Sequence, residues 1–251
     1  MRNTPEHALL LRWLILTGLI AFALIIAWYE HIIQLLFVVD KSKISWAIAS
    51  IYILVTLHCA RRIFIVSQQH NLSQEIDRMV RDAHEFRLSA DTDSVRLNQK
   101  TILSDCIMTR YLSDIYYHHN SRKNDNGDIA SNAADLIEVY ESRLKGPQEI
   151  GWFVTDIMLK LGLLGTIIGF IFMLGSVVDI ADFDVSTMQK VLRHMSTGMG
   201  TALYTTLTGL ICSMLTAMQY HMIDRQADEL LEMIKHLTHT YVIPKMIQQQ
   251  A

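Results

Sequence analysis

The sequence predicts an all-α, polytopic membrane protein with four transmembrane helices and long cytoplasmic helical extensions. The main observation is that the apolar residues gather in four blocks, while the segments between them are polar and charged. Each block is long enough to cross a hydrocarbon core, which needs about 20 helical residues. The blocks cover roughly residues 8–29, 44–66, 152–178 and 195–218.

The composition excludes several classes of function. A formal net charge of −3 gives no basic field for binding nucleic acid. The cysteines Cys59, Cys106 and Cys212 are far apart, so we expect packing residues rather than a disulfide framework or a metal cluster. No Ser/His/Asp set, phosphate-binding loop or metal-ligand spacing is present, so neither an enzyme nor a bound cofactor is expected.

The positions of the basic residues predict the orientation in the membrane. Arg12 flanks the first block, Arg61 and Arg62 close the second, and more basic residues follow. Short cytoplasmic loops carry an excess of Lys and Arg, so both termini and the middle segment are expected in the cytoplasm. Four basic residues do not follow this rule, because they lie in the two external loops: Lys41, Lys43, Lys190 and Arg193. Trp28 and Tyr29 end the first block as an aromatic belt, which indicates a retained anchor.

The chain divides into four predicted regions. They are an N-terminal helix pair at 1–66, a cytoplasmic helical region at 67–150, a second membrane pair at 151–223 and a cytoplasmic C-terminal helix at 224–251. The 67–150 region has no glycine before Gly127 and no proline before Pro147, so long helices are expected there.

Apolar periodicity predicts three helices in the middle region and one in the tail. The first carries Leu72, Ile76, Met79, Ala83 and Phe86, the second Ile102, Cys106, Ile107 and Ile115, and the third Ala133, Leu136, Ile137, Tyr140 and Leu144, with a turn at 124–127 before the third. The tail stripe comprises Tyr220, Ile223, Ala227, Leu230, Ile234, Leu237 and Tyr241. The stripe either packs on the protein's own middle segment or forms a seam between subunits.

The third and fourth blocks each carry a face of small and hydroxyl residues. In the third, Gly162, Gly165, Thr166 and Gly169 recur at i, i+3, i+4 and i+7. In the fourth, Ala202, Thr206, Gly209, Ser213 and Ala217 form another small face, with steps of three and four. Small residues let two membrane helices approach closely, so simple helix packing explains the glycines. A single threonine can bond to its own helix, but several on one face favour a polar seam or a water-filled path.

These two segments, Gly-Leu-Leu-Gly-Thr-Ile-Ile-Gly at 162–169 and Ala-Leu-Tyr-Thr-Thr-Leu-Thr-Gly-Leu at 202–210, resemble the signature segments of the MotA/TolQ/ExbB proton channel family. The resemblance covers roughly 150–223. Four spans with a large insertion between the second and third resemble the MotA arrangement more than the three-span TolQ and ExbB one.

The resemblance implies roles for particular residues. Thr166 and Thr206, with Thr205 beside them, would belong to the ion pathway. Close helix packing at the pore would involve Gly162, Gly165, Gly169, Ala202 and Gly209. The chain departs from the family at Lys160, where apolar residues and a proline are usual. This lysine either extends its amine to the membrane surface or lies at the inner mouth of the path.

The resemblance also implies a partner. An ion path across a bilayer normally needs an ionisable group near its middle. There is no Asp, Glu, His, Lys or Arg between Lys160 and Asp179 or between His194 and His221. In the family the acid is an aspartate on the single membrane helix of a MotB/TolR/ExbD-like protein, and five channel subunits surround two partner chains. The implied function is a homopentameric subunit in a bacterial inner membrane that converts an H⁺ or Na⁺ gradient into mechanical work.

Other interpretations of the sequence stay open. A helical membrane scaffold or sensor that signals through its cytoplasmic bundle would explain the long helices equally well. A solute transporter is disfavoured because the chain has no inverted repeat and no charged site in the middle of the membrane. His58, within the second block, is either a protonation site or a hydrogen-bonded histidine at a helix interface. The sequence does not indicate which process is driven.

Overall fold

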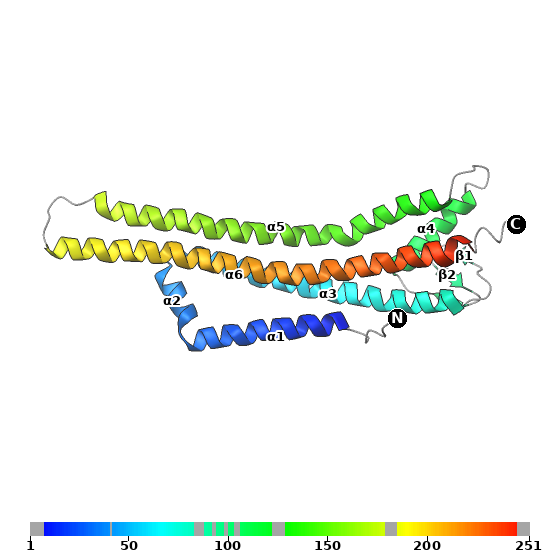
Figure 1. Ribbon diagram of the computed structural model, residues 1–251, viewed down its shortest axis with the longest axis horizontal. Coiled ribbons are helices and arrows are strands. Elements are labelled where there is room, and N and C mark those ends of the chain that lie inside the picture. Colours follow the sequence, from blue (N-terminus) through cyan, green and yellow to red (C-terminus); the bar gives the residue numbers. More distant parts are fainter. Residues whose placement is uncertain are drawn as a thin grey trace. The chain divides into compact units, whose positions relative to one another are not determined.

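The computed structural model (Figure 1) is dominated by helices. It describes residues 8–40, 42–82, 88–91, 94–97, 100–102, 106–121, 129–178 and 185–244. The helices are α1 (Ala8–Tyr29), α2 (Ile32–Val39), α3 (Ile44–Asp82), α4 (Ile107–Ser121), α5 (Ile129–Val178) and α6 (Val185–Leu237), followed by the π-helical turn η1 (Thr238–Val242). The strands are β1 (Leu88–Asp91), β2 (Ser94–Leu97) and β3 (Lys100–Ile102).

The predicted all-α membrane fold is confirmed. Four helices, α1, α3, α5 and α6, are long and apolar enough to cross a membrane. The chain forms two compact units. We call residues 11–61 and 149–222 the span unit, and residues 1–10, 62–148 and 223–251 the bundle unit.

The bundle unit has a continuous apolar core. Its fully or almost fully buried members include Ile76 of α3, Tyr111 of α4, Leu144 of α5 and Ile234 of α6. The Tyr111 hydroxyl donates to the Ala133 carbonyl at 3.0 Å, which joins α4 to the start of α5. From Ala227 to Tyr241, the predicted apolar stripe of the tail therefore packs on the protein's own middle segment.

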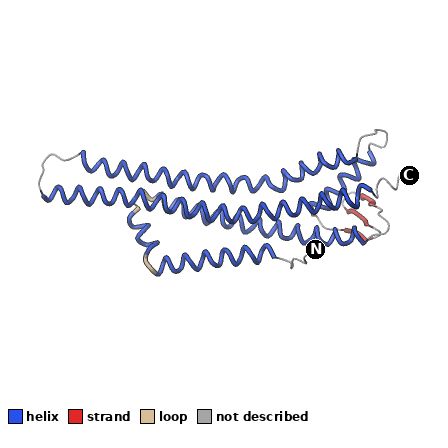
Figure 2. The backbone as a smooth tube through the Cα atoms, viewed as in Figure 1, coloured by secondary structure: helices blue, strands red, loops and turns tan. Residues whose placement is uncertain are grey.

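The bundle unit corrects one part of the sequence prediction. Ile102 does not belong to the second middle helix, because it ends β3 and the helix begins at Ile107. The three strands (red in Figure 2) form one antiparallel sheet in the order β1-β2-β3. Leu88 pairs with Leu97 and Val95 with Ile102, so apolar residues stand opposite each other across the strands.

The start of α4 is fixed by side-chain hydrogen bonds. Gln69 Oε1 accepts from the Ile107 backbone N–H at 2.9 Å, and the buried Cys106 thiol lies 3.2 Å from the Ser73 hydroxyl. The first contact satisfies a backbone N–H that a helix start leaves without an intrahelical partner. On α3, Leu72, Ile76 and Met79 pack in the core as predicted. Ala83, Phe86 and the predicted turn at 124–127 lie outside the described residues.

Helix α5 continues through Gly146 and Pro147. Proline removes one backbone hydrogen bond from a helix interior, here the one that the Arg143 carbonyl would accept. The guanidinium of Arg62 donates to the nearby Leu144 carbonyl at 2.9 Å. This contact ties α3 to α5 in the bundle unit.

In the span unit, α3, α5 and α6 meet at an aromatic contact. The ring of Tyr220 is completely buried, and its hydroxyl lies 2.8 Å from Nδ1 of His58. The same ring packs on Gly151 so closely that a Cβ there would overlap it. Of the two alternatives for His58, the structure shows the hydrogen-bonded histidine at a helix interface.

Candidate functional site

The candidate site lies where α5 and α6 pack against each other in the span unit. Their backbones touch at Gly162 and Gly209, where a Cβ on Gly209 would come within 2.8 Å of the Gly162 Cα. It would also lie 3.0 Å from the Met158 carbonyl oxygen. The close approach predicted from the glycines is therefore present, and it is a contact of backbone on backbone.

Thr205 and Gly165 form the next contact along the pair. Thr205 is completely buried, and a Cβ on Gly165 would lie 2.5 Å from the Thr205 Cβ. The Thr205 hydroxyl donates within α6, to Thr201 at 2.9 Å and to Ala202 at 3.0 Å. The structure thus places Thr205 in the interface between the two helices.

The third contact joins Gly169 to Ala202 and Gly198. A Cβ on Gly169 would lie 2.6 Å from the Ala202 backbone nitrogen and 2.8 Å from the Gly198 carbonyl oxygen. Gly198 was not among the residues predicted for the site. Its spacing of four from Ala202 repeats the small-xxx-small pattern of α5 and is the signal that would have identified it.

Thr206 connects the two helices through a hydrogen bond. Its hydroxyl donates to the Ala202 carbonyl of its own helix at 2.9 Å and approaches the Gly162 carbonyl of α5 at 3.4 Å. Thr166, on the facing helix, donates to the Leu163 carbonyl at 2.6 Å. Both threonine side chains are partly buried.

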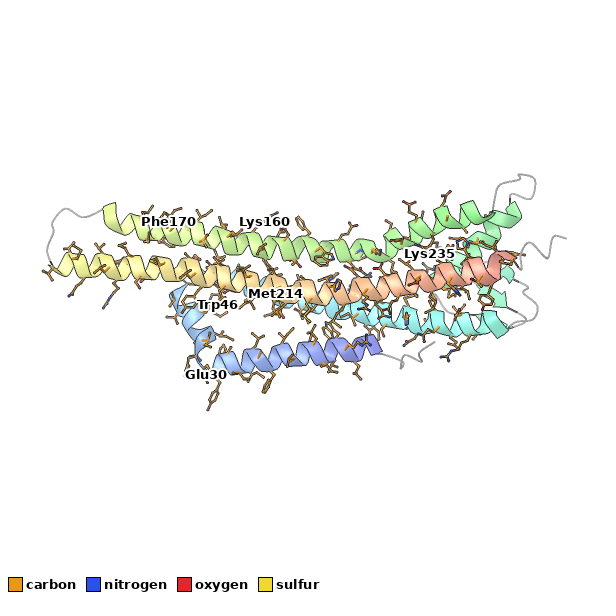
Figure 3. All side chains as sticks on the ribbon, in the orientation of Figure 1. Glu30, Trp46, Lys160, Phe170, Met214 and Lys235 are labelled. Atoms are coloured by element: carbon orange, nitrogen blue, oxygen red, sulfur yellow. The ribbon has the colours of Figure 1, made fainter. Side chains whose placement is uncertain are left out.

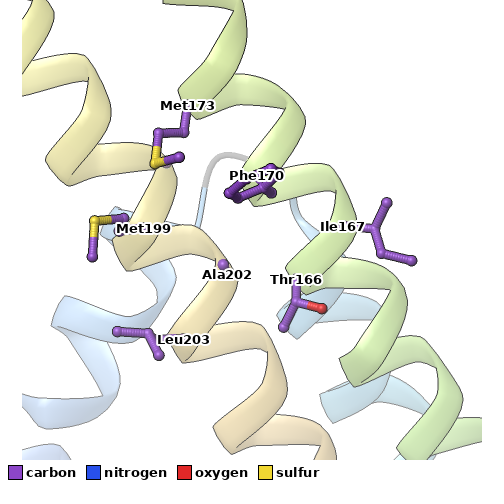
Figure 4. A pocket seen from close by; sticks show the side chains of 8 residues that line it. Thr166, Ile167, Phe170, Met173, Met199, Ala202 and Leu203 are labelled. Carbon is purple, nitrogen blue, oxygen red and sulfur yellow. The ribbon is translucent and has the colours of Figure 1, made fainter.

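A groove of about 440 Å³ runs along the pair on the side of Thr166. It is lined by Thr166, Ile167, Phe170, Met173, Gly198, Met199, Ala202 and Leu203 (Figure 4). The lining is almost wholly apolar, and Thr166 supplies its one side-chain hydroxyl. The groove can therefore accept an apolar helix that presents one polar group at the level of Thr166.

Lys160 lies in the C-terminal half of α5 and precedes Phe170 along the helix (Figure 3). It pairs with Asp156 at 2.5 Å, and the two side chains are 70% and 51% exposed. Thr166 is six positions after Lys160, which is about 9 Å along a helix. The structure does not bring Lys160 into contact with the threonines. An exposed pair of this kind contributes little to stability, because water screens it.

Within the described ranges, no group of three or more His, Cys, Asp or Glu side chains is placed to hold a metal ion. The chemistry of the site therefore lies in hydroxyls, backbone contacts and an apolar groove. All the residues predicted to pack at the pore meet along the α5–α6 pair, together with Thr205 and Thr206.

The sequence was also compared with known proteins. The model of the MotA/TolQ/ExbB proton channel family matches residues 103–236, which include the site residues on both helices. A comparison with curated proteins found no significant match.

Proposed function

Because the chain belongs to the MotA/TolQ/ExbB proton channel family, we propose that it is the channel subunit of an ion-driven motor complex. The proposal is carried by the combination of an apolar groove with one hydroxyl, at Thr166, on two helix stretches, 161–178 and 195–220, that contain no charged residue. Such a pair can line an ion path but supplies no group that carries the ion across. The complex needs an acid from a second protein.

The second protein in this proposal is MotB/TolR/ExbD-like, with a single membrane helix that carries an aspartate. Five copies of the present chain surround two such helices in a bacterial inner membrane, with both termini of the chain in the cytoplasm. The exposed apolar side chains of α5 and α6 are compatible with helix neighbours on these faces. They include Leu163, Ile167, Phe170, Met199, Leu203 and Leu207.

In the proposed mechanism, an ion, H⁺ or Na⁺, neutralises the partner's aspartate beside Thr166 and Thr206. Neutralisation changes which subunit interface the partner helix prefers, since a charged and a neutral acid differ in their free energy of contact with the groove. Repeated around the ring, these steps turn the subunits relative to the partner. Each charge that crosses releases about 2.3 kcal/mol per 100 mV of membrane potential.

Replacement of Thr206 by valine tests the ion path. Valine has nearly the same shape but no hydroxyl, so we expect roughly tenfold slower proton influx with unchanged assembly, because the path loses a polar group in a low-dielectric site. Influx is measured with a cytoplasmic pH indicator after an external acid pulse, in cells that express the chain with its partner, with and without sodium.

Thr208→Val is the matched control, because the Thr208 hydroxyl donates to the Tyr204 carbonyl of its own helix at 2.8 Å. We expect nearly normal influx from this variant. Normal influx from Thr206→Val would contradict the ion path, and tolerance of both substitutions is the result that a scaffold or sensor predicts.

The subunit composition tests the partner. Affinity purification of the chain from native membranes is expected to recover a protein with one membrane helix and an aspartate within it. Native mass spectrometry is then expected to give five copies of the present chain to two of that protein. Recovery of the chain alone, in a complex that still drives ion flux, would contradict the proposal.

A further inference from the structure

The end of α2 contacts α6 on a side that does not belong to the α5–α6 interface. The Thr201 hydroxyl lies 3.0 Å from the Val39 carbonyl and 3.1 Å from the Thr197 carbonyl of α6, so its one hydrogen is shared between the two acceptors, and Thr201 is completely buried. A Cβ on Gly200 would lie 2.7 Å from a methyl group of Val39. Val39 is the last residue of α2, and the last carbonyls of a helix have no intrahelical donors. Thr201 supplies such a donor.

Asp40 organises the turn that carries this carbonyl. Its backbone N–H closes α2 by donating to Leu36 at 3.2 Å. Its carboxylate accepts from the Ser42 N–H at 2.9 Å, the Ser42 hydroxyl at 2.6 Å and the Ser45 N–H at 2.8 Å. The last of these caps the start of α3. Asp40, only 3% exposed, therefore ends α2 with its backbone N–H and begins α3 with its carboxylate.

The turn holds its shape at neutral pH and in mild acid. Burial opposes ionisation of Asp40, but the hydrogen bonds from Ser42 and Ser45 outweigh it and lower the pKa of the carboxyl below its ordinary value. The stabilisation from a lowered carboxyl pKa is present above the ordinary value and is lost as the pH falls through the lowered one. Lys43 has φ 58°, a left-handed conformation that non-glycine residues seldom adopt, so the turn is strongly constrained.

Two threonines of α6 make hydrogen bonds to other helices, and these bonds lie on different sides of α6. Thr206 reaches Gly162 of α5, and Thr201 reaches Val39 of α2. Five residues at 100° each place the two side chains about 140° apart around the helix axis. Each of these two hydroxyls also approaches a carbonyl of α6, Thr197 for Thr201 and Ala202 for Thr206, whereas the hydroxyls of Thr197 and Thr216 donate within α6. Contacts on two sides fix the rotation of a helix, whereas a contact on one side leaves it free to roll.

We propose that Asp40 and Thr201 are positioning residues for the α5–α6 site. The Asp40 turn holds the Val39 carbonyl, and this carbonyl fixes the rotation of α6 that keeps Thr205 and Thr206 against α5. The expected effect on ion flux rests on the proposed function, while the effect on the helix does not.

The test uses the purified complex with its partner in lipid nanodiscs and the variants Thr201→Val, Thr201→Ser and Asp40→Ala. Hydrogen exchange followed by mass spectrometry reports on residues 39–45 and 197–206. Thr201→Val is expected to raise amide exchange in both segments by roughly fivefold, since it removes the bond between the helices. Asp40→Ala leaves α6 itself unaltered and is expected to give the same pattern. Thr201→Ser keeps the hydroxyl and is expected to restore native exchange, a rescue that packing alone does not explain.

Ion flux is measured on the same variants by the acid pulse. Thr201→Val is expected to slow influx by roughly fivefold, and Thr201→Ser to restore it. Thr197→Val, one turn away, is the matched control and is expected to be normal in both measurements. Raised exchange in 39–45 with native exchange in 197–206 overturns the proposal, as does native exchange throughout. If exchange responds as expected but the native complex carries no ions, the positioning is upheld and the proposed function fails.

Discussion

Gly169→Ala is expected to reduce ion-driven proton influx at least tenfold. The added Cβ would lie 2.6 Å from the Ala202 nitrogen and 2.8 Å from the Gly198 oxygen, and both are backbone atoms. A side chain can rotate away from such a clash, but a helix backbone must move as a whole, so α5 and α6 must separate. Overpacking of this kind costs about 1–3 kcal/mol. Membrane helices depend on close packing for their association, because lipid offers no hydrophobic drive between them.

The measurements for this variant are the acid-pulse influx and the thermal unfolding of the purified complex. Gly175→Ala is the control on the same helix, because nothing lies within 4 Å of the Cβ position at Gly175. We expect this control to be normal or slightly more stable, since alanine favours helix over glycine. Equal behaviour of the two variants would contradict the close contact at Gly169.

Gly151→Ala is expected to destabilise the span unit by about 3 kcal/mol or more. The new Cβ would overlap the ring of Tyr220, which is completely buried. The ring cannot turn aside without loss of the hydrogen bond between its hydroxyl and His58, which is 2.8 Å long. A buried polar group without a partner costs free energy. Stability therefore falls whether the ring stays and overlaps the new Cβ or moves and loses its hydrogen bond. The expected result is a clearly lower unfolding temperature of the complex in nanodiscs.

A double-mutant cycle separates this clash from a general effect of alanine at position 151. Tyr220→Ala removes the ring and leaves a cavity, so it is destabilising alone. The double variant Gly151→Ala, Tyr220→Ala is expected to lose much less stability than the sum of the two single variants, because the methyl group enters space that the ring has left. Additive losses would show that the ring and Gly151 do not interact.

Most of the membrane fold could be predicted from the sequence, because a span must be long and apolar whatever packs around it. The tail was predictable for a similar reason, since Ala227, Leu230 and Ile234 repeat with the period of a helix and are all fully buried. The small sheet was missed. Its strands have three or four residues each, too few for alternation to be recognised among helical segments.

The residues of the candidate site could be predicted from the sequence, but the contacts between them could not. Thr205 and Thr206 are adjacent, and the sequence does not say which of them is fully buried against Gly165 and which reaches the Gly162 carbonyl. This depends on the rotation of α6 about its axis. The contact of Thr201 with Val39 was equally inaccessible, because it joins residues 162 positions apart through one hydroxyl and one backbone carbonyl.

The hydroxyls of the site are already committed as donors. Thr166 donates to Leu163, and Thr206 donates to Ala202 at 2.9 Å and more weakly to Gly162 at 3.4 Å, so the one hydrogen of each is engaged with backbone carbonyls of α5 and α6. The lone pairs of the threonine hydroxyl oxygens remain available to an incoming ion or acid. Such an oxygen can accept from the O–H of a neutral carboxylic acid or coordinate a sodium ion, but it has no hydrogen to offer a carboxylate. The threonines therefore discriminate chemically between the loaded and the empty state of an acid brought beside them, although they carry no charge themselves.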